Sequence, residues 1–129
     1  GTGIQPFKTE KDYENWLKRI DEFPIWMDSA IENFRLGIKN NTVLPKSLVL
    51  KMIPQIKAEE ITTFEIDKNI FYGPIKNLPK DFKPVTANKY TKLYQDAIKN
   101  KLIPAYLKMA DFLEKEYFSF PIFSRNLKE

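Results

Sequence analysis

The longest helical pattern in the chain begins Ala87-Asn88-Lys89-Tyr90-Thr91-Lys92-Leu93-Tyr94-Gln95-Asp96-Ala97-Ile98 and continues to Phe118. Its apolar residues are three or four positions apart throughout, which is the spacing of one face of an α-helix. We therefore expect a helix over about residues 87–118, capped by Thr86 and bent by Pro104. At about 1.5 Å per residue this helix reaches about 45 Å, so it is the spine of the molecule. Its apolar positions are Tyr90, Leu93, Tyr94, Ala97, Ile98, Leu102, Ala105, Tyr106, Met109, Phe112, Leu113 and Tyr117.

Three shorter amphipathic stretches precede this spine, and prolines separate them. The first covers about residues 10–22 behind Thr9, a favourable N-cap, and the second covers about residues 24–40. They meet at Pro24, so they form either a tight hairpin or one kinked helix. The third starts at Pro45, and Pro54 should kink it or end it near Ile53.

The pattern weakens over residues 57–85, where Gly-Pro and Leu-Pro pairs indicate turns. We expect short helices and turns there, which pack on the core through Phe64, Phe71, Tyr72 and Phe82. Residues 61–64 fit a short strand or a helical turn, so a small β-ribbon around residues 61–66 is the alternative. The sequence thus predicts one all-α domain over residues 1–129, a helical bundle built on one long kinked C-terminal helix with a loop-rich middle.

Composition excludes several kinds of site. The 129 residues contain no histidine and no cysteine, so neither an imidazole base, a thiol nucleophile nor a Cys/His zinc site is available. We therefore expect no catalytic, cofactor or metal residues in this chain. The net charge of +4 is spread over the chain, and arginine, the usual reader of phosphates and guanines, occurs three times. The scarcity of arginine argues against nucleic-acid binding. No apolar run approaches the roughly 20 residues that a transmembrane helix needs.

A few side chains remain as candidates for chemistry. Glu59 and Glu60, like Glu114 and Glu116, are close in sequence but do not share a helix face, so they are more simply surface acids. Asp28 and Glu32 do share a face and could hold a hard cation, although solvation is the simpler interpretation. Two kinds of residue complete the set: serines without an activating histidine, and aromatics that could stack on ligand rings but more often build a core. They are Ser29, Ser47, Ser119, Ser124, Trp16, Trp26 and the tyrosines of the spine.

The order of several short motifs resembles a known family. Tyr13-Glu14-Asn15-Trp16-Leu17-Lys18-Arg19-Ile20 is followed by Asp28, Gly37 and Pro45, and later by Phe71-Tyr72-Gly73-Pro74-Ile75. Ile103-Pro104-Ala105-Tyr106-Leu107 and Ala110-Asp111-Phe112-Leu113-Glu114-Lys115-Glu116-Tyr117 complete the series. This succession resembles an internal part of the bacterial proteins grouped as domain of unknown function 885, over about residues 10–120.

The resemblance implies a role within a larger protein. Family members look like longer helical zinc metallopeptidases whose metal-binding helix lies downstream, and many are exported or lipid-anchored. It implies that this chain is a non-catalytic segment, a scaffold or a wall of the cleft for a peptide substrate, with zinc only in the parent protein. The compartment stays undetermined, and an exported or lipoprotein parent follows from the resemblance alone.

Two further expectations concern partners. A stand-alone helical module that binds a protein or peptide is the alternative function, and the ten Phe, six Tyr and two Trp support it. If the chain is excised from the parent, the bared apolar surface favours a homodimer. The expected contributors to this dimer are Phe118, Phe120, Ile122 and Phe123.

Overall fold

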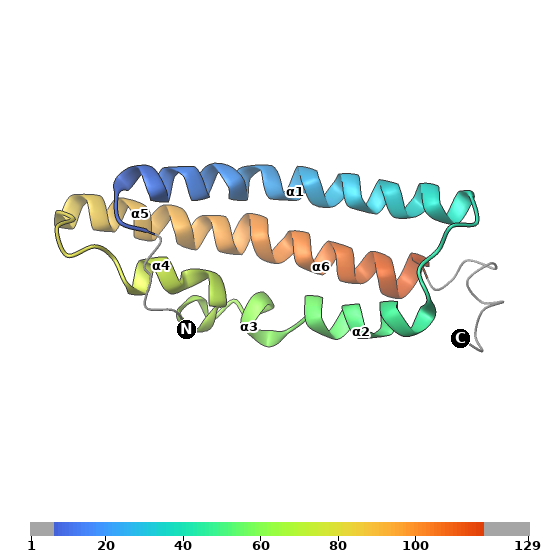
Figure 1. Ribbon diagram of the computed structural model, residues 1–129. Coiled ribbons are helices and arrows are strands. Elements are labelled where there is room, and N and C mark those ends of the chain that lie inside the picture. Colours follow the sequence, from blue (N-terminus) through green and yellow to red (C-terminus); the bar gives the residue numbers. More distant parts are fainter. Residues whose placement is uncertain (1–6, 118–129) are drawn as a thin grey trace.

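The computed structural model describes residues 7–117, and every regular element in this range is helical. Two long helices run side by side (Figure 1). One is α1 (Glu10–Lys39), and the other, the C-terminal helix, is continuous through α5 (Pro84–Ala97), η3 (Ile98–Leu102), α6 (Ile103–Asp111) and η4 (Phe112–Tyr117). The chain between them returns through α2 (Lys46–Ile56), α3 (Glu59–Thr62), η1 (Ile66–Lys68), η2 (Ile70–Tyr72) and α4 (Gly73–Lys76). The predicted all-α fold is confirmed.

The first two predicted helices are one continuous helix. Thr9 caps α1 as predicted, because its hydroxyl accepts from the Asp12 N–H while the Asp12 carboxylate accepts from the Thr9 N–H. The helix then runs for 30 residues through Pro24. Of the two arrangements that the sequence left open at Pro24, the hairpin is wrong. The missing N–H of Pro24 is tolerated because Ile20 and Met27, on either side of it, are buried against the rest of the fold.

The C-terminal helix departs from α-helical geometry before Pro104, where the sequence predicts a disturbance. Residues Ile98–Leu102 form a π-helical turn, and the Ile103 N–H donates to the Ile98 carbonyl five residues earlier. The wider turn lets the helix continue past a residue that has no N–H to donate. The predicted cap is wrong by one turn: the helix starts at Pro84, with Lys83 as N-cap, because proline is favoured in the first turn.

The returning segment is helical where the sequence left a strand open. Residues Glu59–Thr62 form one helical turn, and the described residues contain no strand. Helix α2 passes Pro54 and ends at Ile56, so of the two outcomes expected at Pro54, the end near Ile53 is wrong. Phe71, Tyr72 and Phe82 pack on the core as expected. Phe64 does not, since its side chain is exposed.

The core consists of three clusters in a row along the C-terminal helix. Each combines buried side chains of this helix with those of α1 and of the returning segment. The first holds Tyr13, Ile75, Tyr90 and Tyr94; the second holds Ile20, Ile66, Ala97, Ile98, Leu102 and Ile103; the third holds Met27, Ile31, Ile38, Val49, Ala105, Met109, Phe112, Leu113 and Tyr117. The C-terminal helix is therefore the spine that the apolar spacing predicts.

Buried tyrosines tie these elements together through their hydroxyls. Tyr13 Oη donates to the Pro74 carbonyl at 2.7 Å, and Tyr94 Oη donates to the Tyr13 carbonyl at 3.4 Å. At the other end, the Leu44 N–H donates to Tyr117 Oη at 2.6 Å. Burial raises the pKa of Tyr13 to about 12, because the phenolate would lose its hydration. The tyrosines therefore fix the ends of the returning segment as well as fill the core.

The turn after α1 requires glycine at position 37. The Thr42 N–H donates to the Gly37 carbonyl at 2.7 Å and the Asn41 N–H donates to the Ile38 carbonyl at 3.1 Å, which is the Schellman arrangement. Asn41 adopts the left-handed conformation with φ of 61°, as expected for this helix end. A Cβ atom on Gly37 would lie 2.6 Å from the Thr42 carbonyl oxygen.

Gly37→Ala should therefore lower the free energy of unfolding by about 1–3 kcal/mol, because the turn must open to admit the methyl group. Gly73→Ala is the matched control: Gly73 has helical backbone angles, and a Cβ there meets nothing within 4 Å. It should be neutral or stabilising by up to about 1 kcal/mol. Urea denaturation of the three proteins measures both effects, and equal stability of the two variants would contradict this account of the turn.

Candidate functional site

Three ion pairs join α1 to the C-terminal helix along one flank. Asp21 pairs with Lys101, Asp28 pairs with Lys108 at 2.6 Å, and Arg35 pairs with Glu116 at 2.8 Å. Residue numbers rise together on both helices, so the two helices run parallel. We call these three pairs the ion-pair ladder.

The ladder repeats at coiled-coil spacing. Positions 21, 28 and 35 are seven residues apart, as are 101 and 108, which is the repeat that keeps two helices in contact. Glu116 is eight residues beyond Lys108, and it lies in the π-helical segment η4, whose wider turn accommodates one additional residue. The last pair also has the opposite polarity, with the base on α1. A shift of one heptad in either direction would therefore bring together two acids or two bases.

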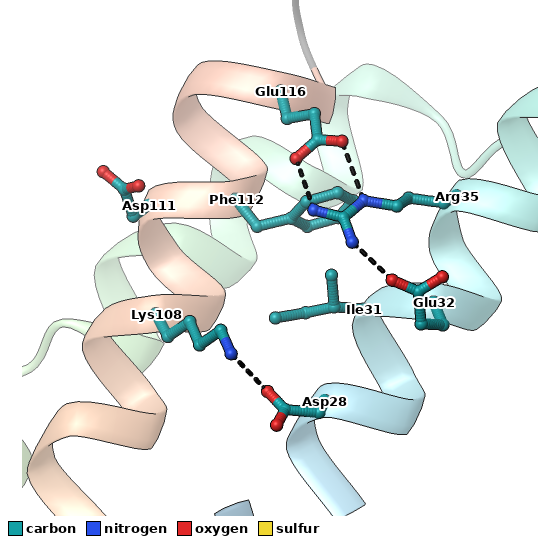
Figure 2. Close-up of a pocket in the computed structure, with 8 residues that line it drawn as sticks. All are labelled: Asp28, Ile31, Glu32, Arg35, Lys108, Asp111, Phe112 and Glu116. Carbon is teal, nitrogen blue, oxygen red and sulfur yellow. Dashed lines mark hydrogen bonds and ion pairs between the residues drawn. The ribbon is translucent and has the colours of Figure 1, made fainter.

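A groove of about 410 Å³ lies between the second and third pairs of the ladder. Figure 2 shows Ile31 and Phe112 between the charged side chains of α1 and those of the C-terminal helix. Its lining residues are Asp28, Ile31, Glu32, Arg35, Lys108, Asp111, Phe112 and Glu116. The size is that of a site for a small molecule, and we treat the groove as the candidate functional site.

Arg35 is the central group of this groove. Its Nε and Nη2 donate to the two oxygens of Glu116 at 2.8 and 2.9 Å, and its Nη1 donates to Glu32. The guanidinium also lies over the Phe112 ring, 5.5 Å from its centre. The hydrogen bonds to Glu116 and Glu32 raise the pKa of Arg35, and the guanidinium lowers the pKa of Glu116. Arg35 therefore binds two carboxylates at once, that of Glu32 on its own helix and that of Glu116 on the C-terminal helix.

The sequence candidates lie in and around this groove. Asp28 and Glu32 line it, but each pairs with a different base, Lys108 and Arg35. Glu116 joins the ladder, whereas Glu114 pairs with Lys57 of the returning segment at 3.0 Å. The separation of Glu114 from Glu116 that helical spacing predicts is thus confirmed.

The remaining candidates do not converge on one place. Glu59 and Glu60 are exposed in α3, and Ser29 and Ser47 are exposed on α1 and α2. Trp16 is partly buried against the core, as the simpler interpretation predicts. Ser119, Ser124 and the four residues of the expected dimer contact, Phe118, Phe120, Ile122 and Phe123, lie outside the described residues.

Sequence reasoning missed an aromatic row on the opposite flank of α1. Trp26 stacks on Phe23 with ring centres 6.0 Å apart, and Phe23 lies 5.1 Å from Tyr106 of the C-terminal helix. Tyr106 in turn stacks on Phe71 of η2 at 5.9 Å. Trp26 remains 63% exposed at one end of this row. The partners come from three distant segments, so no spacing along the chain reveals the row.

Zinc, which the family resemblance implies for the parent protein, does not fit the residues of this chain. The sequence has neither histidine nor cysteine, and the described residues contain no cluster of three acidic side chains placed to hold an ion. No helix in the described part is long and apolar enough to cross a membrane.

Charge reversal tests the ladder. Arg35→Glu should lower the melting temperature, because it places a carboxylate between Glu32 and Glu116. Adding Glu116→Arg should recover part of this loss, since the pair re-forms with the opposite polarity. Lys18→Glu, on an exposed position of the same helix, is the control for net charge. If the double variant melts at or below the temperature of Arg35→Glu, the two residues are not coupled.

The lowered pKa of Glu116 predicts a pH dependence with a definite sign. A folded-state pKa below the ordinary value of 4.5 favours the folded state above pH 4.5, and this contribution disappears as the pH falls through the folded-state pKa. The stability difference between wild type and Glu116→Gln should therefore be largest near pH 6 and shrink below about pH 4. Glu22→Gln, at an exposed position of α1, is the control for the loss of one carboxylate. Urea denaturation at each pH measures the stability difference between wild type and Glu116→Gln. A difference that stays constant with pH would contradict the lowered pKa of Glu116.

Comparison with known proteins identifies the family of this chain. No curated protein and no solved structure matches the chain. The model of the family described as "Bacterial protein of unknown function (DUF885)" matches residues 2–119. This match confirms the family that the order of sequence motifs suggests. The chain belongs to the bacterial DUF885 family, whose function is unknown.

Proposed function

We propose that this chain is a non-catalytic helical segment of a bacterial metallopeptidase-like protein, in which it serves as a scaffold or as one wall of the substrate cleft. An exported or lipid-anchored parent belongs to the same proposal. The observation that carries it is the aromatic row, in which Trp26 is stacked on Phe23 yet mostly exposed. A large exposed ring continuous with the core is typical of a surface that another part of a protein covers.

The core below the row supports this assignment. Phe23, Phe34 and Tyr106 pack on the buried cluster of α1 and the C-terminal helix, but each is only partly buried itself. A neighbouring element laid over this flank would complete their burial, at about 25 cal/mol per Å² of apolar surface covered. The ion-pair ladder on the other flank keeps the two long helices in one register. The aromatic flank can then contact a neighbouring element of the parent protein.

The alternative is a stand-alone helical module that binds a protein or peptide. The same exposed Trp26 supports it, since aromatic anchors dominate such interfaces. The gene separates the two functions: codons for a His-Glu metal-binding helix beyond Glu129 favour the segment of a larger protein, and a stop codon there favours the module.

Two measurements test the proposal. Purified chain supplied with zinc should not cleave peptides, and zinc-dependent turnover would overturn the non-catalytic assignment. The Trp16→Phe variant leaves Trp26 as the one tryptophan of the chain. Its fluorescence should be quenched readily by acrylamide in the isolated chain and become shielded when the rest of the parent protein is added. Ile25→Ser changes an exposed position outside the row and should not alter this shielding. If acrylamide quenches Trp26 equally well with and without the rest of the parent protein, the result favours the stand-alone module.

A further inference from the structure

One end of the molecule carries most of the net charge of the chain. The loop before α5 lies beside the start of α1 at this end (Figure 1). Residues 7–14 and 76–92, which we call the basic end, contain seven lysines and four acidic residues, a net of +3 in a chain of +4. The lysines are Lys8, Lys11, Lys76, Lys80, Lys83, Lys89 and Lys92.

Three of the four acids of the basic end form hydrogen bonds within the fold, whereas its seven lysines form no ion pair in the described part of the chain. The Asp12 carboxylate caps α1, and Glu10 and Glu14 accept hydrogen bonds from the Tyr90 hydroxyl. None of the seven lysines forms an ion pair with another residue of the described chain. The ladder on the adjoining helices uses its lysines differently, because Lys101 and Lys108 are both paired. Lys89 Nζ lies over the Tyr90 ring, 5.2 Å from its centre. No carboxylate of the described chain holds a lysine of the basic end, so these lysines are available to an anionic partner.

The basic end also presents an apolar tip. Val85, in the first turn of α5, is 81% exposed, the largest exposed fraction of any large apolar side chain in the described residues. The start of α5, which carries Val85, is anchored, because the preceding Phe82 ring packs on Tyr13 at 5.4 Å and the Ala87 N–H donates to the Lys83 carbonyl at 2.9 Å. A groove of about 560 Å³ separates the loop from Lys8 and Lys11. Val85 is therefore held outward among lysines.

We propose that the basic end docks on an anionic phospholipid surface, with Val85 entering the interface and the surrounding lysines contacting the headgroups. Each lysine near such a surface strengthens binding by about five-fold. An aliphatic side chain that moves from water into the headgroup region adds a favourable hydrophobic contribution to the binding free energy. Nucleic acid fits less well. The two arginines in the described residues, Arg19 and Arg35, lie outside the basic end, and the exposed apolar residue at its tip has no ring to stack on a base.

Vesicle sedimentation tests the docking. The full chain should bind vesicles of phosphatidylcholine with 30% phosphatidylserine at low salt, and bind pure phosphatidylcholine at least ten-fold more weakly. Lys80→Gln with Lys83→Gln should weaken binding by about 25-fold. Lys39→Gln with Lys51→Gln removes the same charge from exposed positions outside the basic end and should change it by less than two-fold. Val85→Ser should weaken it by about ten-fold at unchanged net charge.

Each other outcome overturns the proposal. The first is that the chain does not bind the anionic vesicles. The second is that the control pair loses as much vesicle affinity as the Lys80 and Lys83 pair, which would indicate attraction by net charge alone. The third is that Val85→Ser binds the vesicles as tightly as wild type. A short DNA duplex that displaces the chain from vesicles and binds Val85→Ser as tightly as wild type would assign the basic end to nucleic acid. Circular dichroism checks that each variant is folded, and Lys76→Gln with Lys92→Gln serves as a second charge-neutralising pair within the basic end.

Discussion

The fold depends on the register between α1 and the C-terminal helix. Both helices present an apolar face to the same core, and such faces alone permit sliding by a heptad. The ladder opposes sliding through its polarity, since Asp21 and Asp28 are acids on α1 while Arg35 is a base. Exposed ion pairs contribute little stability individually. Their effect here is on specificity, because wrong registers bring like charges together.

Because the two long helices are parallel, the chain between them must return along the length of the bundle. Buried tyrosines bind this returning segment at both of its ends. A buried phenol needs a hydrogen-bond partner, whereas leucine or phenylalanine in the same place does not. Tyr13 finds its partner in the Pro74 carbonyl and Tyr117 in the Leu44 N–H, at the two ends of the returning segment. The same residues fill the core and close the connection, so a tyrosine at these positions does what an aliphatic residue cannot.

The surface divides into parts with different chemistry. One flank of α1 is charged and internally paired, with Arg35 held between Glu32 and Glu116 above Phe112. The other flank is aromatic and incompletely covered at Trp26. The basic end adds unpaired lysines around Val85. A family segment that covers its aromatic flank with neighbouring protein would keep the charged groove and the basic end free for other contacts.

The helices and most of the core could be predicted from the order of the residues. Apolar spacing located the start of the spine within one turn, and Thr9 predicted the start of α1, because these features depend on neighbours three or four residues away. The order of the residues did not determine whether Pro24 divides two helices, whether residues 61–64 are strand or helix, or that Phe64 is exposed. Only the tertiary structure placed Asp28 against Lys108 and Phe23 against Tyr106. These arrangements depend on the relative position of helices about 80 residues apart in sequence, and no pattern of local spacing encodes that position.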